Sequence, residues 1–264
     1  MGNVKIGTCG YSYKDWVGPF YTEGTKSKDY LPYYSSIFPI LEVDYTYYQM
    51  PKAENLKNMV DEAGPSLTFS LKATETLTHT VDPHNWKKEA KLYITAIEPI
   101  RSAGRLDAIL FQFPASFRYK DYNRRYLSEL LEVFSGVPAA VEFRNSEWSS
   151  KSVLDGLKKR SVTLVAVDLP NMFSKPPEIN EPTTPLAYYR LHGRNSENWQ
   201  GTNSTARYDY LYNDHELSGI VQRVKCLAEK ADRLHIFFNN HARGQAPQNA
   251  ITLKNLLDNE KMLL

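Results

Sequence analysis

Hydrophobic residues recur along the chain in short runs that are separated by longer, more polar stretches. Each run is five to eight residues long and rich in β-branched and aromatic residues, which is typical of a buried strand. Near-continuous hydrophobicity within a run favours parallel strands that are covered on both faces. The eight runs are residues 4–8, 40–46, 67–73, 107–114, 139–144, 162–168, 187–193 and 233–240.

Amphipathic patterns between these runs predict helices. At residues 51–64, Pro51 fits the first turn of a helix that stops at Gly64. Residues 121–136 and 214–231 each carry an apolar stripe with helical spacing. Helices that alternate with parallel strands indicate an α/β fold.

Eight strands alternating with helices over about 250 residues are the pattern of a closed (β/α)₈ barrel, or TIM barrel. The main alternative is an open, doubly wound sheet, but its usual G-x-G-x-x-G turn is absent from the sequence GTCGYS at 7–12. Residues 169–185 contain too many prolines for a full helix, so we expect an irregular crossover there. No shift of composition marks a second domain, which predicts a single barrel domain over residues 1–264.

Composition limits the classes of function. The chain has 264 residues, of which 42% are hydrophobic, so it can bury a large core. A net charge of +2 argues against a nucleic-acid coat protein. Cys9 and Cys226 form no metal or redox spacing. No run has the length of a signal peptide's apolar region or of a membrane span, so the sequence predicts a cytoplasmic protein without a membrane partner.

Ionisable and amide residues stand at the end of nearly every predicted strand. In a (β/α)₈ barrel the carboxyl ends of the strands gather the βα loops, and functional side chains lie there. Side-chain alternation puts Glu42 and Asp44 on one face, and likewise Arg190 and His192. The strand ends carry Cys9, Tyr11, Glu42, Asp44, Lys72, Gln112, Glu142, Arg144, Asp168, Arg190, His192, Asn239 and Asn240.

Two interpretations of this cluster are open at this point. Buried charges without partners cost several kcal/mol each, so they must pair or be used. In a structural interpretation, these charges form a closed ion-pair network, in which Glu142 pairs with neighbours of Arg144 and Glu42 pairs with Lys72 or Arg190. In a functional interpretation, charges from many strands converge on a ligand at one end of the barrel.

The loops after the seventh and eighth runs are rich in cationic and amide side chains. Barrels often bind phosphate with these two loops and a helix N-terminus, which would lie near Gln248 and Asn249. Alternatively, the amides of Asn239 and Asn240 tie down loop backbones. These loops supply His192, Arg194, Asn239, Asn240, His241 and Arg243.

Tyrosine is unusually frequent, with 18 residues. Tyrosine buries an apolar ring and keeps a polar tip, so an excess often lines pockets and interfaces. Tyr11 and Trp16 lie in the loop after the first run, where rings beside a charged mouth can stack on a base or a sugar. A hydrophobic lid or a partner interface would explain the same rings.

Several motifs, specific only in combination, resemble one protein family over essentially the whole chain. They are GTCGYSYKDWVGPFY at 7–21, LEVDYTYYQMP at 41–51, FSLKA at 69–73, FQFPASF at 111–117, VEFRNSEW at 141–148, YYRLHGR at 188–194 and FFNNHARGQAPQNA at 237–250. The family is domain of unknown function 72 (DUF72), also known as YecE-like. Many members have tryptophan where this chain has Tyr11. The resemblance implies a TIM barrel and no established reaction.

The sequence supports three hypotheses for function. In the first, a hydrolase at the barrel mouth acts on a small anionic, phosphate-containing substrate; metal-assisted cleavage of nucleic acid is one variant, by analogy with other barrels. In the second, the same mouth binds a nucleotide, a sugar phosphate, nucleic acid or a protein without catalysis. In the third, exposed tyrosines form a scaffold's partner interface.

The first hypothesis assigns roles to residues. Arginines would clamp the anion, Glu42 or Glu142 would be the general acid or base, and His192 would carry a proton near neutral pH. The catalytic candidates are Glu42, Lys72, Glu142, Asp168 and His192. The substrate-binding candidates are Tyr11, Trp16, Gln112, Arg144, Arg190, Arg194, Asn239, Asn240, His241 and Arg243.

The sequence names neither a metal nor a cofactor. A diagnostic spacing such as H-E-x-x-H does not occur. Nearby Lys72, Arg144 and Arg190 would neutralise carboxylates without an ion. The residues near strand ends that have metal-ligating side chains are Glu42, His79, Glu142, Asp168, His192 and His241.

Overall fold

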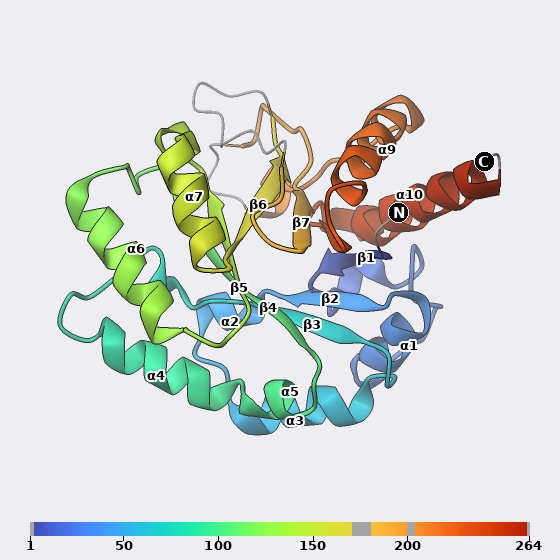
Figure 1. Cartoon of the computed structure of the whole chain (residues 1–264). Helices are drawn as coiled ribbons and strands as arrows, with labels where there is room; N and C mark the ends of the chain where they lie inside the picture. Colours follow the sequence, from blue (N-terminus) through green and yellow to red (C-terminus); the bar gives the residue numbers. More distant parts are fainter. Residues whose placement is uncertain (1–2, 171–180, 200–203, 263–264) are drawn as a thin grey trace.

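A computed structural model describes residues 3–170, 181–199 and 204–262. Eight parallel strands pair in chain order, and the last pairs with the first, so the sheet closes into a barrel (Figure 1). The predicted (β/α)₈ barrel is therefore confirmed. The strands are β1 (Asn3–Cys9), β2 (Ile40–Val43), β3 (Thr68–Lys72), β4 (Leu106–Phe113), β5 (Ala139–Phe143), β6 (Thr163–Asp168), β7 (Leu186–Leu191) and β8 (Arg233–Phe238).

Helices pack around the outside of the barrel (Figure 1). The described helices are α1 (Tyr30–Ile37), α2 (Tyr45–Tyr48), α3 (Ala53–Glu62), α4 (Trp86–Ala96), α5 (Glu98–Ser102), α6 (Asp121–Val133), α7 (Lys151–Lys159), α8 (Ser204–Arg207), α9 (Asp214–Ala228) and α10 (Gln245–Met262). The three helices predicted at residues 51–64, 121–136 and 214–231 correspond to α3, α6 and α9. Residues 171–180 of the predicted crossover lie outside the described residues.

Some predicted boundaries are wrong. The run at 40–46 is strand only as far as Val43, because Asp44 adopts helical backbone angles and α2 begins at Tyr45. Thr46 fixes this turn, since its hydroxyl donates to the carbonyls of Val43 and Lys72 at 3.0 and 2.6 Å. Pro51 precedes α3 and does not lie within its first turn.

The barrel has two cores. The larger core lies between the strands and the helices and includes the buried aromatic rings of Trp16, Trp148 and Phe111. A smaller core fills the barrel interior with alternate strand residues, and burying each large apolar side chain contributes about 1.5–3 kcal/mol. The interior core contains Cys9, Ile40, Ala108, Leu110, Ala140, Val165, Leu186, Tyr188 and Phe237.

Glycine is required where β1 approaches β2. A Cβ atom at Gly7 would lie 2.1 Å from the carbonyl oxygen of Ile40, which is far inside van der Waals contact. Any side chain at this position would push the two paired strands apart. Gly7 thus allows the register that places Cys9 beside Glu42.

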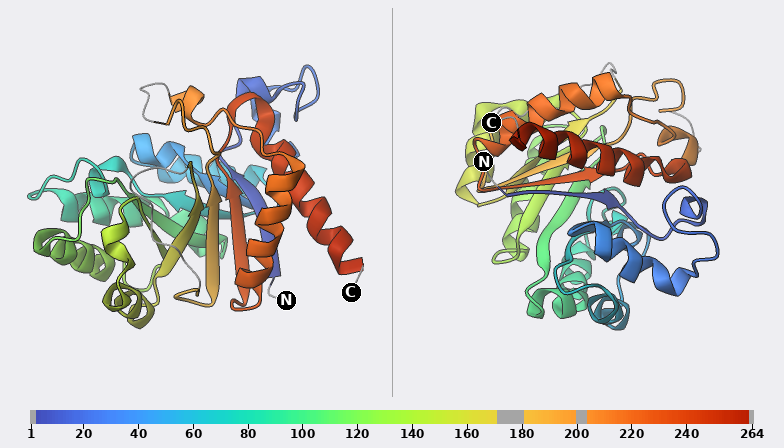
Figure 2. Two further views of the ribbon diagram at one scale, coloured as in Figure 1. Left: turned by 90° about the horizontal axis from the view of Figure 1, so that it is seen from above. Right: turned by 90° about the vertical axis from the view of Figure 1, so that its right-hand side faces the viewer.

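The end of the chain closes the fold beside its beginning. Helix α9 begins at a capping box, in which Asn213 accepts from the Glu216 backbone and Glu216 accepts from the Asn213 backbone, both at 3.0 Å. Helix α10 then runs back past β1, so both ends of the described chain lie on one side of the molecule (Figure 2). The loops after β1 and β7 lie at the opposite end of the strands, which is the barrel mouth (Figure 2).

Candidate functional site

A buried arginine forms the centre of the barrel mouth. Arg190 of β7 has a side chain that is 1% exposed, and it lies between two carboxylates that are 0% exposed. Its Nε and Nη2 atoms donate to Glu42 of β2 at 2.6–3.1 Å, and its Nη1 atom donates to Glu142 of β5 at 2.7 Å. Of the two partners that the sequence offers for Glu42, Lys72 and Arg190, the structure has Arg190. This pairing compensates charges that would otherwise be strongly destabilising inside a protein.

Each carboxylate has a second partner. The Tyr188 hydroxyl donates to Glu42 at 2.5 Å, and the Arg144 Nε atom donates to Glu142. Burial alone would raise the pKa of Glu142, but Arg144 and Arg190 hold it well below its usual range. Glu142 is therefore ionised at neutral pH and holds two guanidinium groups in place. A carboxylate this strongly paired is poorly suited to exchange protons.

His192, which directly follows β7, is a neutral ring within this network. Its Nε2 atom accepts from Arg144 Nη2 at 3.0 Å, and its Nδ1 atom lies 2.8 Å from the side-chain amide of Asn239. Burial, together with the charges of Arg144 and Arg190, holds the pKa of His192 well below its usual range. A change of charge near neutral pH does not fit this environment, so the role predicted for His192 as proton carrier is revised to that of a hydrogen-bond acceptor.

Asp44 follows β2 and lies next to the network of Arg190, Glu42 and Glu142. Its Oδ1 atom is 4.0 Å from Arg190 Nη2, is buried, and has no hydrogen-bond partner among the described residues. The side chain as a whole is 21% exposed. Burial and the neighbouring charge of Glu42 raise the pKa of Asp44 to about 7, against the opposing charges of Lys72 and Arg190. Asp44 therefore exchanges its proton in the pH range where general acids and bases work best.

The charge of Lys72 acts on this carboxyl group and also on the neighbouring His79 ring. Lys72 ends β3, and its ammonium lies 4.2 Å from the centre of the Tyr47 ring. It forms no ion pair with a carboxylate in the described part of the chain. The Tyr47 ring meets the His79 ring at 5.1 Å. Burial, with the charges of Lys72 and Arg144, lowers the pKa of His79 to about 4, so both cations act on one neutral ring.

Aromatic rings form the rim on the opposite side. Tyr13 stacks on His241 at 4.7 Å with nearly parallel planes, and Tyr208 lies 5.4 Å from the same imidazole. The Trp199 ring lies 5.7 Å from the Arg144 guanidinium, within the range of a cation–π contact. Aromatic rings are thus present beside the charged mouth. Tyr13 comes from the loop after β1, where such rings were expected, whereas Trp199 and Tyr208 come from other segments.

Tyr11 and Trp16 lie outside the mouth. Trp16 is fully buried, and its indole donates to the His241 carbonyl at 2.7 Å, so it anchors the loop after β1. Tyr11 packs against Tyr34 in the outer core. Both were predicted to contact substrate, and the structure gives both a packing role instead, because the loop folds its largest rings inward.

Asp168 and Arg194 form a separate structural unit. Arg194 donates to both carboxylate oxygens of Asp168, at 2.9 and 2.7 Å, and Tyr212 donates to the same carboxylate at 2.9 Å. Arg194 also contacts Glu216 of the α9 capping box at 3.3 Å. These bonds fasten the loop after β7 to α9. The roles predicted for Asp168 in catalysis and for Arg194 in anion binding are not supported by this geometry.

The loop after β8 is also tied down by its own side chains. Asn240 donates to the Tyr210 carbonyl at 2.8 Å and to Asn249 at 2.9 Å, and Asn249 accepts from the Tyr212 backbone at 3.1 Å. Arg243 is 70% exposed and pairs with Asp209. Asn240 therefore holds the loop backbone in place, which is the alternative role considered from the sequence. Arg243 lies on the surface, and the geometry does not support a position for it in the mouth. Asn239 remains a candidate site residue because its side-chain amide contacts His192.

Gln112 stays close to the network through strand register. It pairs with Glu142 across β4 and β5, so their side chains stand on the same face of the sheet. Its side chain is partly exposed. Gln112 is thus retained as a candidate for contact with a ligand.

One group of potential metal ligands occurs among the described residues. Ligand atoms of Cys9, Glu42 and Asp44 lie within 4.8 Å of one another. However, both oxygens of Glu42 already accept hydrogen bonds from Arg190, and burial raises the pKa of the Cys9 thiol well above its usual value. A cation would have to displace a buried guanidinium from this group. The donor set therefore does not fit a divalent ion.

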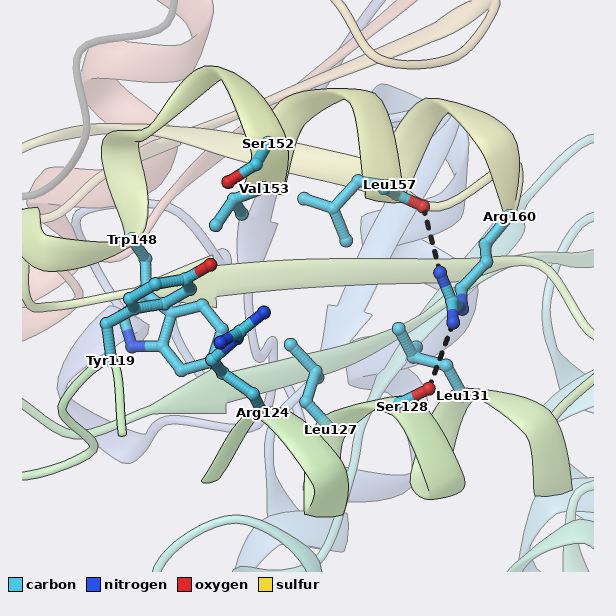
Figure 3. A pocket seen from close by; sticks show the side chains of 11 residues that line it. Tyr119, Arg124, Leu127, Ser128, Leu131, Trp148, Ser152, Val153, Leu157 and Arg160 are labelled. Atoms are coloured by element: carbon cyan, nitrogen blue, oxygen red, sulfur yellow. Dashed lines mark hydrogen bonds between the residues drawn. The ribbon is translucent and has the colours of Figure 1, made fainter. Parts of the chain in front are cut away.

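Two cavities outside the central network differ in position. One, of about 230 Å³, lies on the outer surface between α6 and α7, where Leu127 and Leu131 face Val153 and Leu157 (Figure 3). Arg160 closes one end through a 2.9 Å bond to Ser128 (Figure 3). The other, of about 490 Å³, lies beside the mouth and has His79 in its wall. Only the second is placed to communicate with the charged site.

Asp44 ends a predicted strand but is not among the site residues selected from the sequence, and neither are Tyr13, which lies in the aromatic loop after the first run, Trp199 and Tyr208. A signal was present for Asp44, because it shares a strand face with Glu42. The pKa of Asp44 depends on burial and on Lys72, which come from packing. The three rings lie in long loops, where sequence gives no periodicity to orient a side chain.

Comparisons with known proteins agree with this architecture. The family model described as "Protein of unknown function DUF72" matches residues 5–263. The chain belongs to the DUF72 family. This confirms the resemblance inferred from the motifs.

Similar proteins match nearly the whole chain. UPF0759 protein YunF of Bacillus subtilis is 29% identical and covers 97% of this chain and 95% of its own. A DUF72 family protein from Thermotoga maritima is 34% identical, with a TM-score of 0.88 over 97% of this chain and 99% of its own. A DUF72 family protein from Enterococcus faecalis has a TM-score of 0.85 at 24% identity, over 97% of this chain and 95% of its own, which shows the shared fold.

None of the described helices is both long enough and apolar enough to cross a membrane.

Proposed function

We propose that this DUF72 protein binds a small phosphate-containing anion at the barrel mouth and hydrolyses its phosphoester by general acid–base chemistry. The observation that carries the proposal is the position of Lys72 and Arg144, two partly exposed cations beside a buried network whose own carboxylates are already paired. Lys72, Arg144 and Arg190 contribute three positive charges against the two of Glu42 and Glu142. With Asp44 protonated, the site has an excess of one positive charge.

The excess charge favours an anion. Lys72 and Arg144 both act on His79, so they converge on one side of the mouth. Guanidinium and ammonium groups bind phosphate oxygens through charge-assisted hydrogen bonds. The buried carboxylates preorganise Arg144, since its Nε atom is held by Glu142 and its Nη2 atom by His192. A preorganised donor loses little entropy when the anion binds.

Asp44 is the proposed general acid. Its proton passes to the leaving oxygen as the bond between phosphorus and that oxygen breaks, water adds to phosphorus, and a proton from this water returns to Asp44. A bound dianion would raise the pKa of Asp44 further and keep it protonated until the reaction. This assignment replaces Glu42 and Glu142, whose oxygens are engaged by Arg190, Tyr188 and Arg144.

Binding and turnover test this proposal separately. Calorimetric titration with inorganic phosphate should show about tenfold weaker binding for Lys72→Met, with Lys57→Met as a control because Lys57 is exposed and pairs with Asp61. Asp44→Asn should bind phosphate normally and hydrolyse p-nitrophenyl phosphate about 10²-fold to 10⁴-fold more slowly. Unchanged phosphate affinity in Lys72→Met would refute the anion site.

A second candidate function is binding without catalysis. It is favoured by the complete pairing of Glu42 and Glu142, which makes them structural. It predicts that the wild-type protein binds phosphate through Lys72 but shows no turnover, and that Asp44→Asn changes nothing except the pH dependence of binding.

A further inference from the structure

The cavity of about 490 Å³ lies between the loops after β3 and β4 and the first turns of α4 and α6. This volume falls within the range of small-molecule sites, about 300–1,000 Å³. It contributes nothing to the charged network, and the proposed hydrolysis does not use it. It is nevertheless placed at the mouth end of the barrel, because α4 and α6 follow β3 and β4.

Aromatic rings dominate the wall of this cavity. Tyr126 meets Trp86 edge-to-face at 5.1 Å and Phe117 at 6.4 Å, and a 2.7 Å bond from its hydroxyl to the Leu77 carbonyl fixes its ring. Tyr122 stands at the rim with 69% exposure. None of the described lining residues carries a carboxylate, an ammonium or a guanidinium group. The cavity is thus suited to an uncharged, flat group.

His79 connects the cavity to the anion site. Its ring lines the cavity and also contacts Tyr47, which carries the Lys72 ammonium on its face. Thr78 fixes the imidazole through a 2.9 Å contact with Nδ1. With a pKa of about 4, the ring is neutral at physiological pH and adds no charge to the wall. A molecule reaching from Lys72 into the cavity would therefore cross His79.

We propose that this cavity is a second subsite, which takes the aromatic ring of a ligand whose phosphate group binds at Lys72 and Arg144. The proposal rests on the proposed function for the phosphate site and narrows its ligand class to ring-bearing phosphate monoesters of the size of a nucleoside monophosphate. Stacking of one base on aromatic side chains strengthens binding by about tenfold or more. The apolar wall supplies this gain without a charged partner.

Three probes and one cavity-filling variant test the subsite. Inorganic phosphate, ribose 5-phosphate and adenosine monophosphate are titrated by calorimetry, and the nucleotide should bind at least tenfold more tightly than ribose 5-phosphate. Ser116 lines the cavity and is exposed, so Ser116→Trp fills it without disturbing the core. In this variant the nucleotide should bind no better than ribose 5-phosphate, while phosphate binding is unchanged. Ser152→Trp, in the cavity between α6 and α7, is the matched control.

The outcomes separate this inference from the proposed function. Equal affinities for the nucleotide and ribose 5-phosphate in the wild type would overturn the subsite and leave the phosphate site intact. Unchanged nucleotide affinity in Ser116→Trp would also overturn it. Nucleotide binding that Ser116→Trp abolishes and Lys72→Met does not weaken would support the ring subsite and refute the phosphate site.

Discussion

At the carboxyl end of the barrel, Arg190 is buried between Glu42 and Glu142 and hydrogen-bonds to both. At the amino end, His235 of β8 is equally buried, with 1% exposure, yet neither ring nitrogen has a hydrogen-bond partner among the described residues. The nearest carboxylate, Asp107, is 3.7 Å away and accepts from Thr68. One end of the barrel interior holds permanent charges, whereas the other holds a ring that must stay neutral.

Arg190 keeps its charge and His235 does not because the two side chains have different numbers of hydrogen-bond acceptors around them. Arg190 finds acceptors on two strands, so its charge is compensated and burial does not neutralise it. The His235 ring has no hydrogen-bond acceptor among the described residues. Burial therefore lowers its pKa to about 4, against the opposing effect of Asp107. Removing one partner from the network at the mouth should therefore destabilise the protein. At the amino end, lowering the pH should destabilise it.

Arg190→Met should have the largest effect. It leaves Glu42 with the Tyr188 hydroxyl as its main remaining hydrogen-bond donor among the described residues, and it removes one of the two cations on Glu142. Breaking a buried ion pair from one side costs about 3–5 kcal/mol, which urea unfolding at pH 7.5 would detect. Arg243→Met is the control, because an exposed pair contributes about 0–1 kcal/mol. A loss of under 1 kcal/mol for Arg190→Met would show that the network is not a structural unit.

Acidification should destabilise the protein through His235. Its pKa is lowered from 6.5 in the unfolded chain to about 4, so the unfolded state binds more protons between these values. The contribution of the neutral His235 ring to the free energy of unfolding is fully present above pH 6.5. It is lost as the pH falls to 4, which lowers the free energy of unfolding by about 3 kcal/mol. His79 and His192 act in the same direction. Unfolding between pH 7.5 and 4.5 should depend less on pH in His235→Phe.

The matched control for this second prediction is His215→Phe, because His215 is exposed at the start of α9. The free energy of unfolding of this variant should depend on pH in the same way as that of the wild type. Equal slopes for His235→Phe and the wild type would contradict the view that the amino end of the barrel responds to acid through this ring.

Asp44→Asn should stabilise the protein at alkaline pH. The pKa of Asp44 is raised from 3.8 to about 7, so folding favours the protonated form. The stability it contributes is complete below pH 3.8 and is lost as the pH rises to 7. Asparagine avoids this loss, giving a gain of roughly 4 kcal/mol at pH 8 and none at pH 4. Thermal unfolding at both values, with the exposed Asp61→Asn as control, measures it.

Tyr188→Phe should have the smallest effect. It removes the 2.5 Å hydrogen bond to Glu42 and leaves Arg190 in place. A hydrogen bond to a charged group contributes about 1.5–3 kcal/mol, and the lower value is expected here because the carboxylate keeps its main partner. Urea unfolding should show no change for Tyr122→Phe, which is 69% exposed. A loss for Tyr188→Phe larger than that for Arg190→Met would reverse the proposed order of partners.

Much of the mouth could be predicted because strand residues obey a period of two. That period placed Glu42, Glu142 and Arg190 inside one closed barrel before any contact was known. It offered Lys72 and Arg190 as alternative partners for Glu42 and did not choose between them. The choice depends on side-chain reach across the barrel, and only the packed interior shows that Arg190 lies between the two carboxylates.

Loop residues were predicted less well. Arg194 and Arg243 look like anion-binding residues in the sequence, but Asp168 and Asp209 pair with them. Trp16 looks like a stacking surface and is buried, while Tyr13, three residues earlier, faces His241. A loop has no repeating geometry that fixes where a side chain points, so these contacts are set by segments that are distant in the chain.

The sequence by itself determined the eight strands, their parallel barrel and the gathering of ionisable residues at one end, because hydrophobic runs and strand alternation are local properties of the chain. Only the tertiary structure decided which charges remain available. The pKa values of Asp44 and His235 depend on burial and on neighbours from other strands. Burial and charge pairing are sums over the whole packed molecule, and no single stretch of sequence contains them.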